Sequence, residues 1–263
     1  MLTHQSLIVD HQSKDFLFLH LRDLPYFRAL VRSVEASFYQ TLDLPAPTLD
    51  VGCGDGHFAS LTFDQTIDVG LDPEISLLCE ASRRKAYRTL VQADGGRIPF
   101  RDGCFASAFS NSAMEHILHV EAVLAEVSRV LRTGARFAFC VPNPRYLSSL
   151  SISRLLGNGY TGWFRKISRV QHADDPQTWQ ARLEKAGFRL EKWWHYFSPP
   201  AMRVLEWGHY FGLPSLVARK LSGRWVIVPR KWNLWLTERL IRQYASTQPV
   251  EDGTFTFYIA RRL

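Results

Sequence analysis

The stretch formed by residues 48–58, TLDVGCGDGHF, restricts the fold of this chain more than any other part of the sequence. Leu49 and Val51 are apolar, the acid Asp50 lies between them, and three glycines follow at alternate positions. This pattern predicts a short strand, a tight turn and the start of a helix. Glycines allow positive φ angles and close approach of a ligand to the main chain, and the first helical turn offers N–H groups. The stretch therefore predicts a loop that binds a nucleotide-like ligand.

The spacing of the glycines distinguishes between two kinds of nucleotide. A dinucleotide fingerprint places its third glycine three positions after the second, whereas here the interval is two. Asp50 disfavours a pyrophosphate but suits a ligand that carries an ammonium group. The loop resembles motif I of the class I S-adenosylmethionine-dependent methyltransferases. This resemblance implies S-adenosylmethionine as cofactor, with its methionine part near Asp50 and the loop residues Gly52, Cys53, Gly54 and Gly56.

A second acid follows the next predicted strand, residues 67–71. Asp72 lies 20 residues after Gly52 and is followed by Pro73. In a doubly wound fold, a carboxylate at this position accepts hydrogen bonds from both ribose hydroxyls. An ordinary turn acid before proline is the alternative. The position relative to the glycine loop favours cofactor binding for Asp72, with Pro73 beside it.

A third acid, Asp94, follows the short strand predicted at residues 89–92. In the methyltransferases that the chain resembles, an acid here meets the adenine amino group. Asp94 is the matching residue, with Gly95 next to it and apolar residues at Ile98 and Phe100. The family usually has an aspartate where this chain has Ala106, so the resemblance is incomplete at that position.

The fourth predicted strand, residues 106–110, ends in the run Asn-Ser-Ala-Met-Glu-His at 111–116. Ligands bind at the carboxyl ends of strands in open α/β sheets, so Asn111 joins the candidate cofactor-binding residues. A helix over residues 120–131 and a fifth strand over 136–141 follow. The Glu-His pair and the later run RVLRTGAR also resemble the methyltransferase family. All of these features occur in the family's order over about 100 residues.

The chain is predicted to be a single α/β domain over residues 1–263. We expect an N-terminal helical lid at 1–46, a cofactor-binding core at 47–144, and substrate-side insertions with strands six and seven at 145–263. The helix expected over residues 27–38 suits either a lid over the cofactor or a helix packed on the sheet edge. The resemblance implies a Rossmann-like seven-stranded sheet of order 3-2-1-4-5-7-6 with strand seven antiparallel. Helical insertions are expected after strands five and six: residues 143–179 are irregular, and 199–245 suggest two helices.

Composition limits the compartment and the partners. The four cysteines are scattered without a C-x-x-C pair, so neither a metal site nor a disulfide framework is expected. No uncharged apolar run approaches the roughly 20 residues that span a bilayer, and we expect a cytoplasmic protein. Residues 145–263 carry 19 Lys/Arg and 8 Asp/Glu, a charge of +11, and the remaining 144 residues carry −4. All eight tryptophans lie in the basic part.

The basic, tryptophan-rich part is the one indication of the methyl acceptor. A solvated basic face around an ordinary core, a nucleic-acid surface and a membrane-facing surface all fit it. No recognisable RNA- or DNA-binding module is present, so we predict a small-molecule or lipid-like acceptor, with peripheral contact to an anionic membrane. The membrane-facing side chains would be Leu216, Val217, Leu221, Trp225 and the region 232–235, with Arg219, Lys220, Arg230 and Lys231.

Transfer of a methyl group from a sulfonium mainly requires positioning and exclusion of water. A general base is needed when the acceptor is a hydroxyl or a weakly acidic carbon. His172, in the segment after strand five, is the first candidate for a base, although a packed or surface histidine is the commoner case. An RNA-directed methyltransferase and a catalytically silent S-adenosylmethionine-binding scaffold remain as alternative functions. The glycine spacing disfavours a nicotinamide dehydrogenase.

Overall fold

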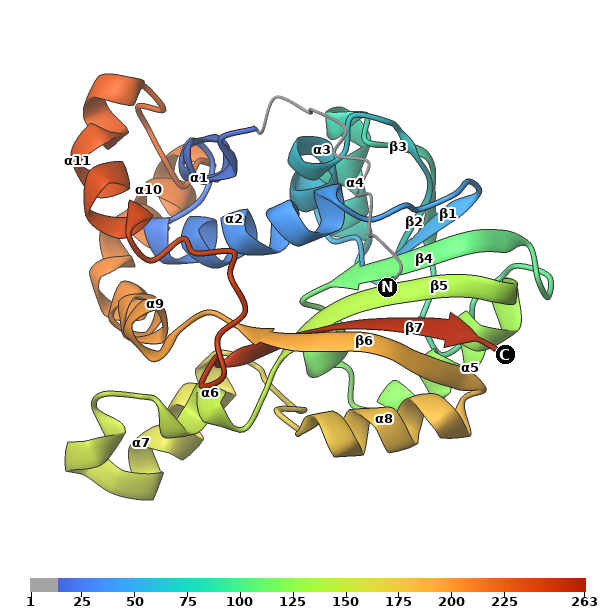
Figure 1. The fold of residues 1–263 in the computed structure, drawn as a ribbon. Coiled ribbons are helices and arrows are strands. Elements are labelled where there is room, and N and C mark those ends of the chain that lie inside the picture. The colour runs from blue at the N-terminus through green and yellow to red at the C-terminus, as the bar shows by residue number, and fades with distance from the viewer. Residues whose placement is uncertain (1–13) are drawn as a thin grey trace, which may run out of the picture.

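The computed structural model describes residues 14–263, apart from the side chains at 154, 155, 213 and 214, so part of the expected 1–46 lid lies outside the described residues. A seven-stranded sheet of order β3-β2-β1-β4-β5-β7-β6 forms its centre (Figure 1). β7 is antiparallel to β5 and β6, and the other pairings are parallel. The predicted fold class and strand order are confirmed. The strands are β1 Thr48–Val51, β2 Ile67–Asp72, β3 Tyr87–Gln92, β4 Phe105–Asn111, β5 Leu131–Pro142, β6 Phe188–Tyr196 and β7 Phe255–Arg262.

Helices cover both faces of the sheet. They are α1 Phe16–Leu21, α2 Tyr26–Gln40, α3 His57–Thr62, α4 Ile75–Arg84, the 3-10 helix η1 Met114–His116, α5 Val120–Val130, α6 Arg145–Ser148, α7 Ser153–Ile167, α8 Pro176–Lys185, α9 Pro199–Phe211, α10 Leu213–Ser222 and α11 Lys231–Arg242. α5 and α8 pack on one face, where the apolar stripe of α5 is fully buried. α1 and α2 pack on the other face, against a cluster that includes Phe109 and Phe257.

Two insertions contain more helix than the sequence predicts. Residues 143–179, expected to be irregular, include α6 and α7, and residues 199–245 hold three helices instead of two. In α7, three glycines lower helix propensity, but burial of Tyr160 and Phe164 stabilises the helix, which is kinked at Gly157. α9 and α10 follow one another with only Gly212 between them, and this glycine keeps a right-handed helical conformation. Neither the kink in α7 nor the junction at Gly212 changes the spacing of apolar residues along the sequence. The sequence pattern therefore did not predict either feature.

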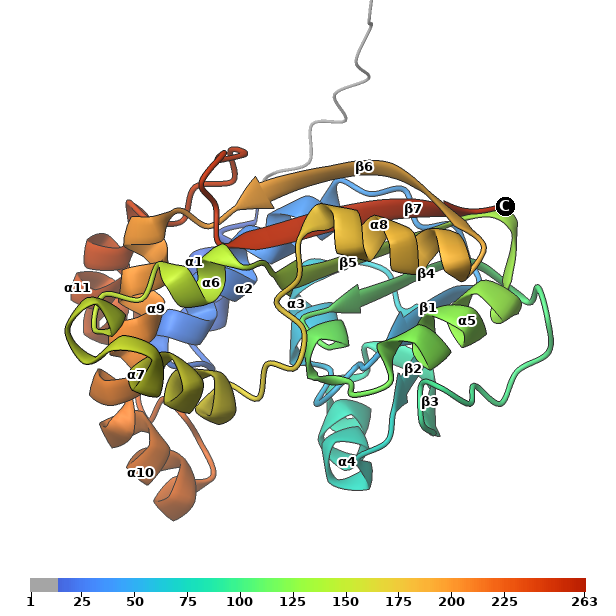
Figure 2. The same cartoon turned by 90° about the horizontal axis from the view of Figure 1, so that it is seen from below.

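The insertion helices gather beyond the carboxyl ends of the parallel strands. Figures 1 and 2 place α7, α9, α10 and α11 together at this end of the molecule, towards which β4 points and from which β7 points away. α2 reaches the same end and packs on α9. A Cβ atom at Gly208 of α9 would lie 2.3 Å from Cβ of Phe27, so the two helices meet closely only because this residue is glycine. No helix within residues 14–263 is long and apolar enough to cross a membrane.

Candidate functional site

The glycine loop joins β1 to α3 and has the backbone shape that the sequence predicts. Gly52, Gly54 and Gly56 have φ angles of 77°, 54° and 70°. The Gly52 and Cys53 amides both donate to the Leu71 carbonyl, at 2.8 and 3.0 Å, which fixes the loop beside β2. A Cβ atom at Gly52 would lie 2.5 Å from that of Ala113, whereas one at Gly54 would meet nothing within 4 Å. The loop is therefore closed on its β4 side and open above Gly54.

Asp72 links the end of β2 to this loop. Its Oδ2 accepts a hydrogen bond from the Gly54 amide at 2.9 Å, and its Oδ1 accepts one from the Glu74 amide at 2.9 Å. Pro73 lies between Asp72 and Glu74, and its carbonyl accepts a hydrogen bond from the Gln92 side chain at 3.1 Å. Each carboxylate oxygen keeps a second lone pair for a further donor. Contact of Asp72 or Pro73 with a ribose stays a prediction.

Asp50 lies beneath the loop and is buried. Its Oδ2 accepts a hydrogen bond from the Tyr87 hydroxyl at 2.6 Å, and burial raises the pKa of the carboxyl to about 7. Tyr87 reaches Asp50 by lying across Gly70, where a Cβ atom would be 2.8 Å from the tyrosine ring. Sequence reasoning missed Tyr87. Gly70, a glycine inside a strand, was the available indication, because such glycines mark close approach of another group.

Asp94 and Gly95 lie in the turn that follows β3. The Ala93 amide donates a hydrogen bond to the Asp72 carbonyl at 3.3 Å, which holds this turn beside Asp72. Asp94 is exposed, and its Oδ1 accepts from the Gly96 amide at 2.7 Å. Gly95 is buried, and a Cβ atom there would lie 3.2 Å from Val123. The acids at positions 50, 72 and 94 thus belong to three adjacent strand ends. Contact of Asp94 with adenine stays a prediction.

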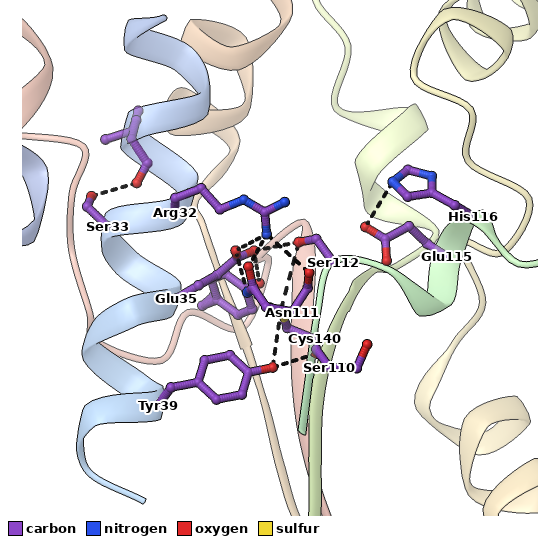
Figure 3. Close-up of polar contacts among 12 residues, drawn as sticks. Arg32, Ser33, Glu35, Tyr39, Ser110, Asn111, Ser112, Glu115, His116 and Cys140 are labelled. Atoms are coloured by element: carbon purple, nitrogen blue, oxygen red, sulfur yellow. Dashed lines mark hydrogen bonds and ion pairs between the residues drawn. The ribbon is translucent and has the colours of Figure 1, made fainter. Parts of the chain in front are cut away.

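Asn111 takes part in a buried cluster that the sequence did not predict (Figure 3). Its Nδ2 donates to Oε2 of Glu35, on α2, at 2.8 Å, and to the Cys140 sulfur at 3.2 Å. The other oxygen of Glu35 accepts from the hydroxyls of Tyr196 at 2.9 Å and Ser112 at 3.2 Å. The Asn111 side chain therefore bonds to α2, and its contact with the cofactor stays a prediction. An acid on the apolar face of the predicted helix 27–38 was the available indication of this cluster.

Arg32, one turn before Glu35 on α2, completes this cluster. Its Nη1 contacts Glu35 Oε2 at 3.1 Å and also the amide oxygen of Asn111. The side chain is 20% exposed and extends from α2 towards the segment that follows β4 (Figure 3). Glu115 lies in that segment, where burial raises the pKa of its carboxyl. Its Oε2 has no hydrogen-bond partner among the described residues.

His172 lies next to the same segment. Its backbone amide donates to the Glu115 carbonyl at 3.1 Å, and its Nε2 lies 3.0 Å from the Ile117 carbonyl. Its Nδ1 lies 3.4 Å from Asp174 and 3.5 Å from Arg182. Both ring nitrogens thus have partners in the fold, so His172 would have to release one before taking a proton. Its catalytic role stays a prediction.

A pocket of about 710 Å³ adjoins the loop at Asp55. α4 contributes Arg83 and Arg84 to its wall, and the connection between α10 and α11 contributes Arg224 and Trp225. Within residues 14–263 no group of three or more His, Cys, Asp or Glu side chains is arranged to hold a metal ion. The open space above Gly54, the carboxylate of Asp72 and the buried acid beneath the loop fit a nucleoside that carries positive charge.

Part of the chain is similar in sequence to known methyltransferases. Residues 49–139 match a family model described as a methyltransferase domain, and every predicted cofactor-binding residue lies within that range. A malonyl-[acyl-carrier protein] O-methyltransferase from Legionella pneumophila is 28% identical over 122 residues, 44% of this chain and 43% of that protein. Sterol methyltransferase-like 1 from Botryococcus braunii is 31% identical over 162 residues, 54% of this chain and 38% of that protein. The chain spans less than half the length of these curated relatives.

The fold is also shared with solved structures. An S-adenosylmethionine-dependent methyltransferase from Mesorhizobium loti superposes with a TM-score of 0.55, at 19% identity, over 87% of this chain and 96% of that chain. The family match covers the glycine loop, and the superposition extends over most of the chain. Residues 49–139 therefore match a methyltransferase domain, and the chain shares the fold of S-adenosylmethionine-dependent methyltransferases.

Proposed function

We propose that this chain transfers a methyl group from S-adenosylmethionine to a small-molecule or lipid-like acceptor. The observation that carries the proposal is the placement of Asp50, Asp72 and Asp94 on or just after three adjacent strands, with Asp72 bonded to a glycine loop that is open above Gly54. The cofactor supplies a methyl group on a positively charged sulfur, which is already activated for displacement. The work left to the protein is to bind, to orient and to exclude water.

Each acid would serve a different part of the cofactor. The carboxylate form of Asp50 would attract the cationic methionine part, and Asp72 keeps a lone pair on each oxygen for the ribose. Asp94 is exposed and can accept a hydrogen bond from an adenine amine. α2 covers this region, since Glu35 holds it to the ends of β4 and β6. The helix therefore acts as a fixed wall that keeps water from the reacting groups.

The acceptor would lie at the carboxyl end of β4, where ligands bind in open α/β sheets. Arg32 and Glu115 face this region, and they suit an acceptor that presents an anionic or hydrogen-bonding group. If the acceptor is a hydroxyl or a carbon acid, His172 is the predicted base. Glu115 is a second candidate, because its Oε2 has no hydrogen-bond partner among the described residues and burial raises the pKa of its carboxyl.

The names of the relatives support the acceptor class. One is described as methylating a malonyl group on an acyl-carrier protein and another as a sterol methyltransferase-like protein. The first name denotes a small acyl group carried on a protein, and the second denotes a lipid. The arginine-lined pocket beside Asp55 and the basic charge of residues 145–263 agree with an acceptor that is anionic or amphipathic.

The proposal is tested by methyl transfer from labelled S-adenosylmethionine to a fractionated cell extract, sorted into lipid, small polar, protein and RNA pools. We expect label in the lipid or small polar pool. Gly52→Val is the matched control, because its side chain would collide with Ala113 and distort the loop. Label in the RNA pool alone would refute the acceptor class. No label in any pool, with cofactor binding retained in calorimetry, would favour the scaffold alternative.

A further inference from the structure

The helices α10 and α11 and the connection between them carry an unusual number of exposed apolar side chains. Trp232 is 76% exposed and Leu221 is 84% exposed, although such side chains are commonly buried. We call this surface the α10–α11 face. Its main apolar members are Val217, Leu221, Trp232, Trp235, Leu236 and Leu240. Both views show α10 and α11 at the same end of the molecule (Figures 1 and 2).

The helix α11 is apolar on two opposite sides. Leu234 and Ile241 are buried and form its inner side, as expected for a helix packed on a domain. Trp232, Trp235, Leu236 and Leu240 recur at intervals of three and four residues, so they share the outer side. Packing within the chain explains the inner side only. An outer apolar stripe of this extent indicates a surface that contacts something else.

The charges around the stripe are mostly basic, and Glu238, an acid on α11, is paired with Arg242. Between Trp207 and Thr237 the sequence contains five basic residues and no acidic one. Arg239 stacks on Trp235, with its guanidinium carbon 5.3 Å from the ring centroid. Arginine and lysine side chains that surround tryptophan and leucine are typical of helices that lie in a membrane interface, where the apolar groups enter the lipid and the cations meet anionic headgroups.

A second copy of the chain fits this surface less well. A two-fold symmetric contact would place the same basic residues of both copies next to one another, because a two-fold interface pairs each patch with itself. Such like-charge contacts are unfavourable. An anionic bilayer complements both the apolar stripe and its basic border.

We propose that the α10–α11 face docks this protein on an anionic lipid bilayer. Arg219 and Trp225, which belong to α10 and to the connection after it, also line the pocket that reaches Asp55 of the glycine loop. Docking would therefore bring the mouth of the cofactor site to the lipid surface, where an amphipathic acceptor could enter. This delivery of the acceptor rests on the proposed function, whereas docking itself does not.

The test is co-sedimentation of the full chain with phosphatidylcholine vesicles and with vesicles that also contain phosphatidylglycerol. We expect at least about tenfold tighter binding to the anionic vesicles, and weaker binding in 0.5 M NaCl. Replacing both Trp232 and Trp235 with serine should weaken binding about tenfold or more, because apolar area leaves the lipid. Trp193→Ser is the matched control, since Trp193 is also exposed but lies on β6. That variant should bind as the unaltered chain does.

The outcomes separate docking from catalysis. No binding to anionic vesicles by a chain that still binds S-adenosylmethionine would overturn the docking proposal and leave the proposed function intact. Vesicle binding without methyl transfer to any pool would support docking and remove the proposed function. A dimer in sedimentation velocity that the Trp232 and Trp235 replacements dissociate, with no vesicle binding, would assign the face to a second copy and overturn the proposal.

Discussion

Replacing Asp50 with asparagine should stabilise the cofactor-free protein at alkaline pH. The folded protein holds the pKa of this carboxyl at about 7 because burial disfavours its charged form, against an ordinary value of 3.8. The folded state thus retains the proton more strongly than the unfolded state does. The stability that the group contributes is fully present below about pH 4 and is lost as pH rises through 7.

The size of the effect follows from this difference. A shift of about 3 pKa units corresponds to roughly 4 kcal/mol at pH 8.5, at 1.36 kcal/mol per unit, and this is an upper value. Asparagine keeps an oxygen that can accept from the Tyr87 hydroxyl and carries no charge. We therefore expect Asp50→Asn to raise the free energy of unfolding by about 2–4 kcal/mol at pH 8.5 and by far less at pH 4.5.

Urea unfolding of both proteins at the two pH values, without cofactor, measures the difference. Equal differences at pH 4.5 and 8.5, or a less stable variant at pH 8.5, would refute the reasoning. Calorimetry with S-adenosylmethionine gives an independent check. Because a cationic ligand favours charged Asp50, affinity of the unaltered protein should increase from pH 6 to pH 8, whereas Asp50→Asn should bind weakly with little pH dependence in this range.

Three further substitutions test the site and the wall around it. Asp72→Ala should weaken S-adenosylmethionine binding by at least about 1 kcal/mol in calorimetric titration, and unchanged affinity would remove this residue from the site. Gly208→Val should lower the free energy of unfolding in urea by about 2 kcal/mol or more, because its side chain meets Phe27, and adding Phe27→Ala should restore part of the loss. Glu35→Ala should lower the free energy of unfolding in urea by about 3 kcal/mol, since it leaves Arg32 and other buried donors without their acceptor. A decrease below about 1 kcal/mol would contradict the described cluster.

The strands and most of the helices around the sheet were predictable because their determinants are local. Alternating strand and helix patterns gave the elements, and the glycine loop at residues 52–56 fixed which strand comes first in the cofactor-binding half. The strand order itself came from the family resemblance, since periodicity does not specify which strands pair. α7 was missed because burial of Phe164 outweighs the low helix propensity of its glycines.

The candidate site was predictable only in part. Asp50, Asp72 and Asp94 each follow or belong to a strand beside the loop, and parallel pairing brings their strand ends together. Glu35 and Tyr87 were not recognised as site residues. Glu35 meets Asn111 across 76 positions of sequence and Tyr87 meets Asp50 across 37, and such distant pairs leave no spacing that can be recognised along the chain.

The Glu35 cluster has a consequence for the order of events in turnover. Swinging α2 open would break the hydrogen bonds of Glu35 with Asn111 and Tyr196 and would bring the buried side of the helix into water. The demethylated cofactor is therefore expected to leave by another route. The arginine-lined pocket between α4 and the α10–α11 connection offers such a route, because it reaches the glycine loop at Asp55. Product release would then be governed by movements of the connection that carries Trp225. In a protein that is docked on a bilayer by the α10–α11 face, the cofactor and the acceptor would pass through the same pocket, one after the other.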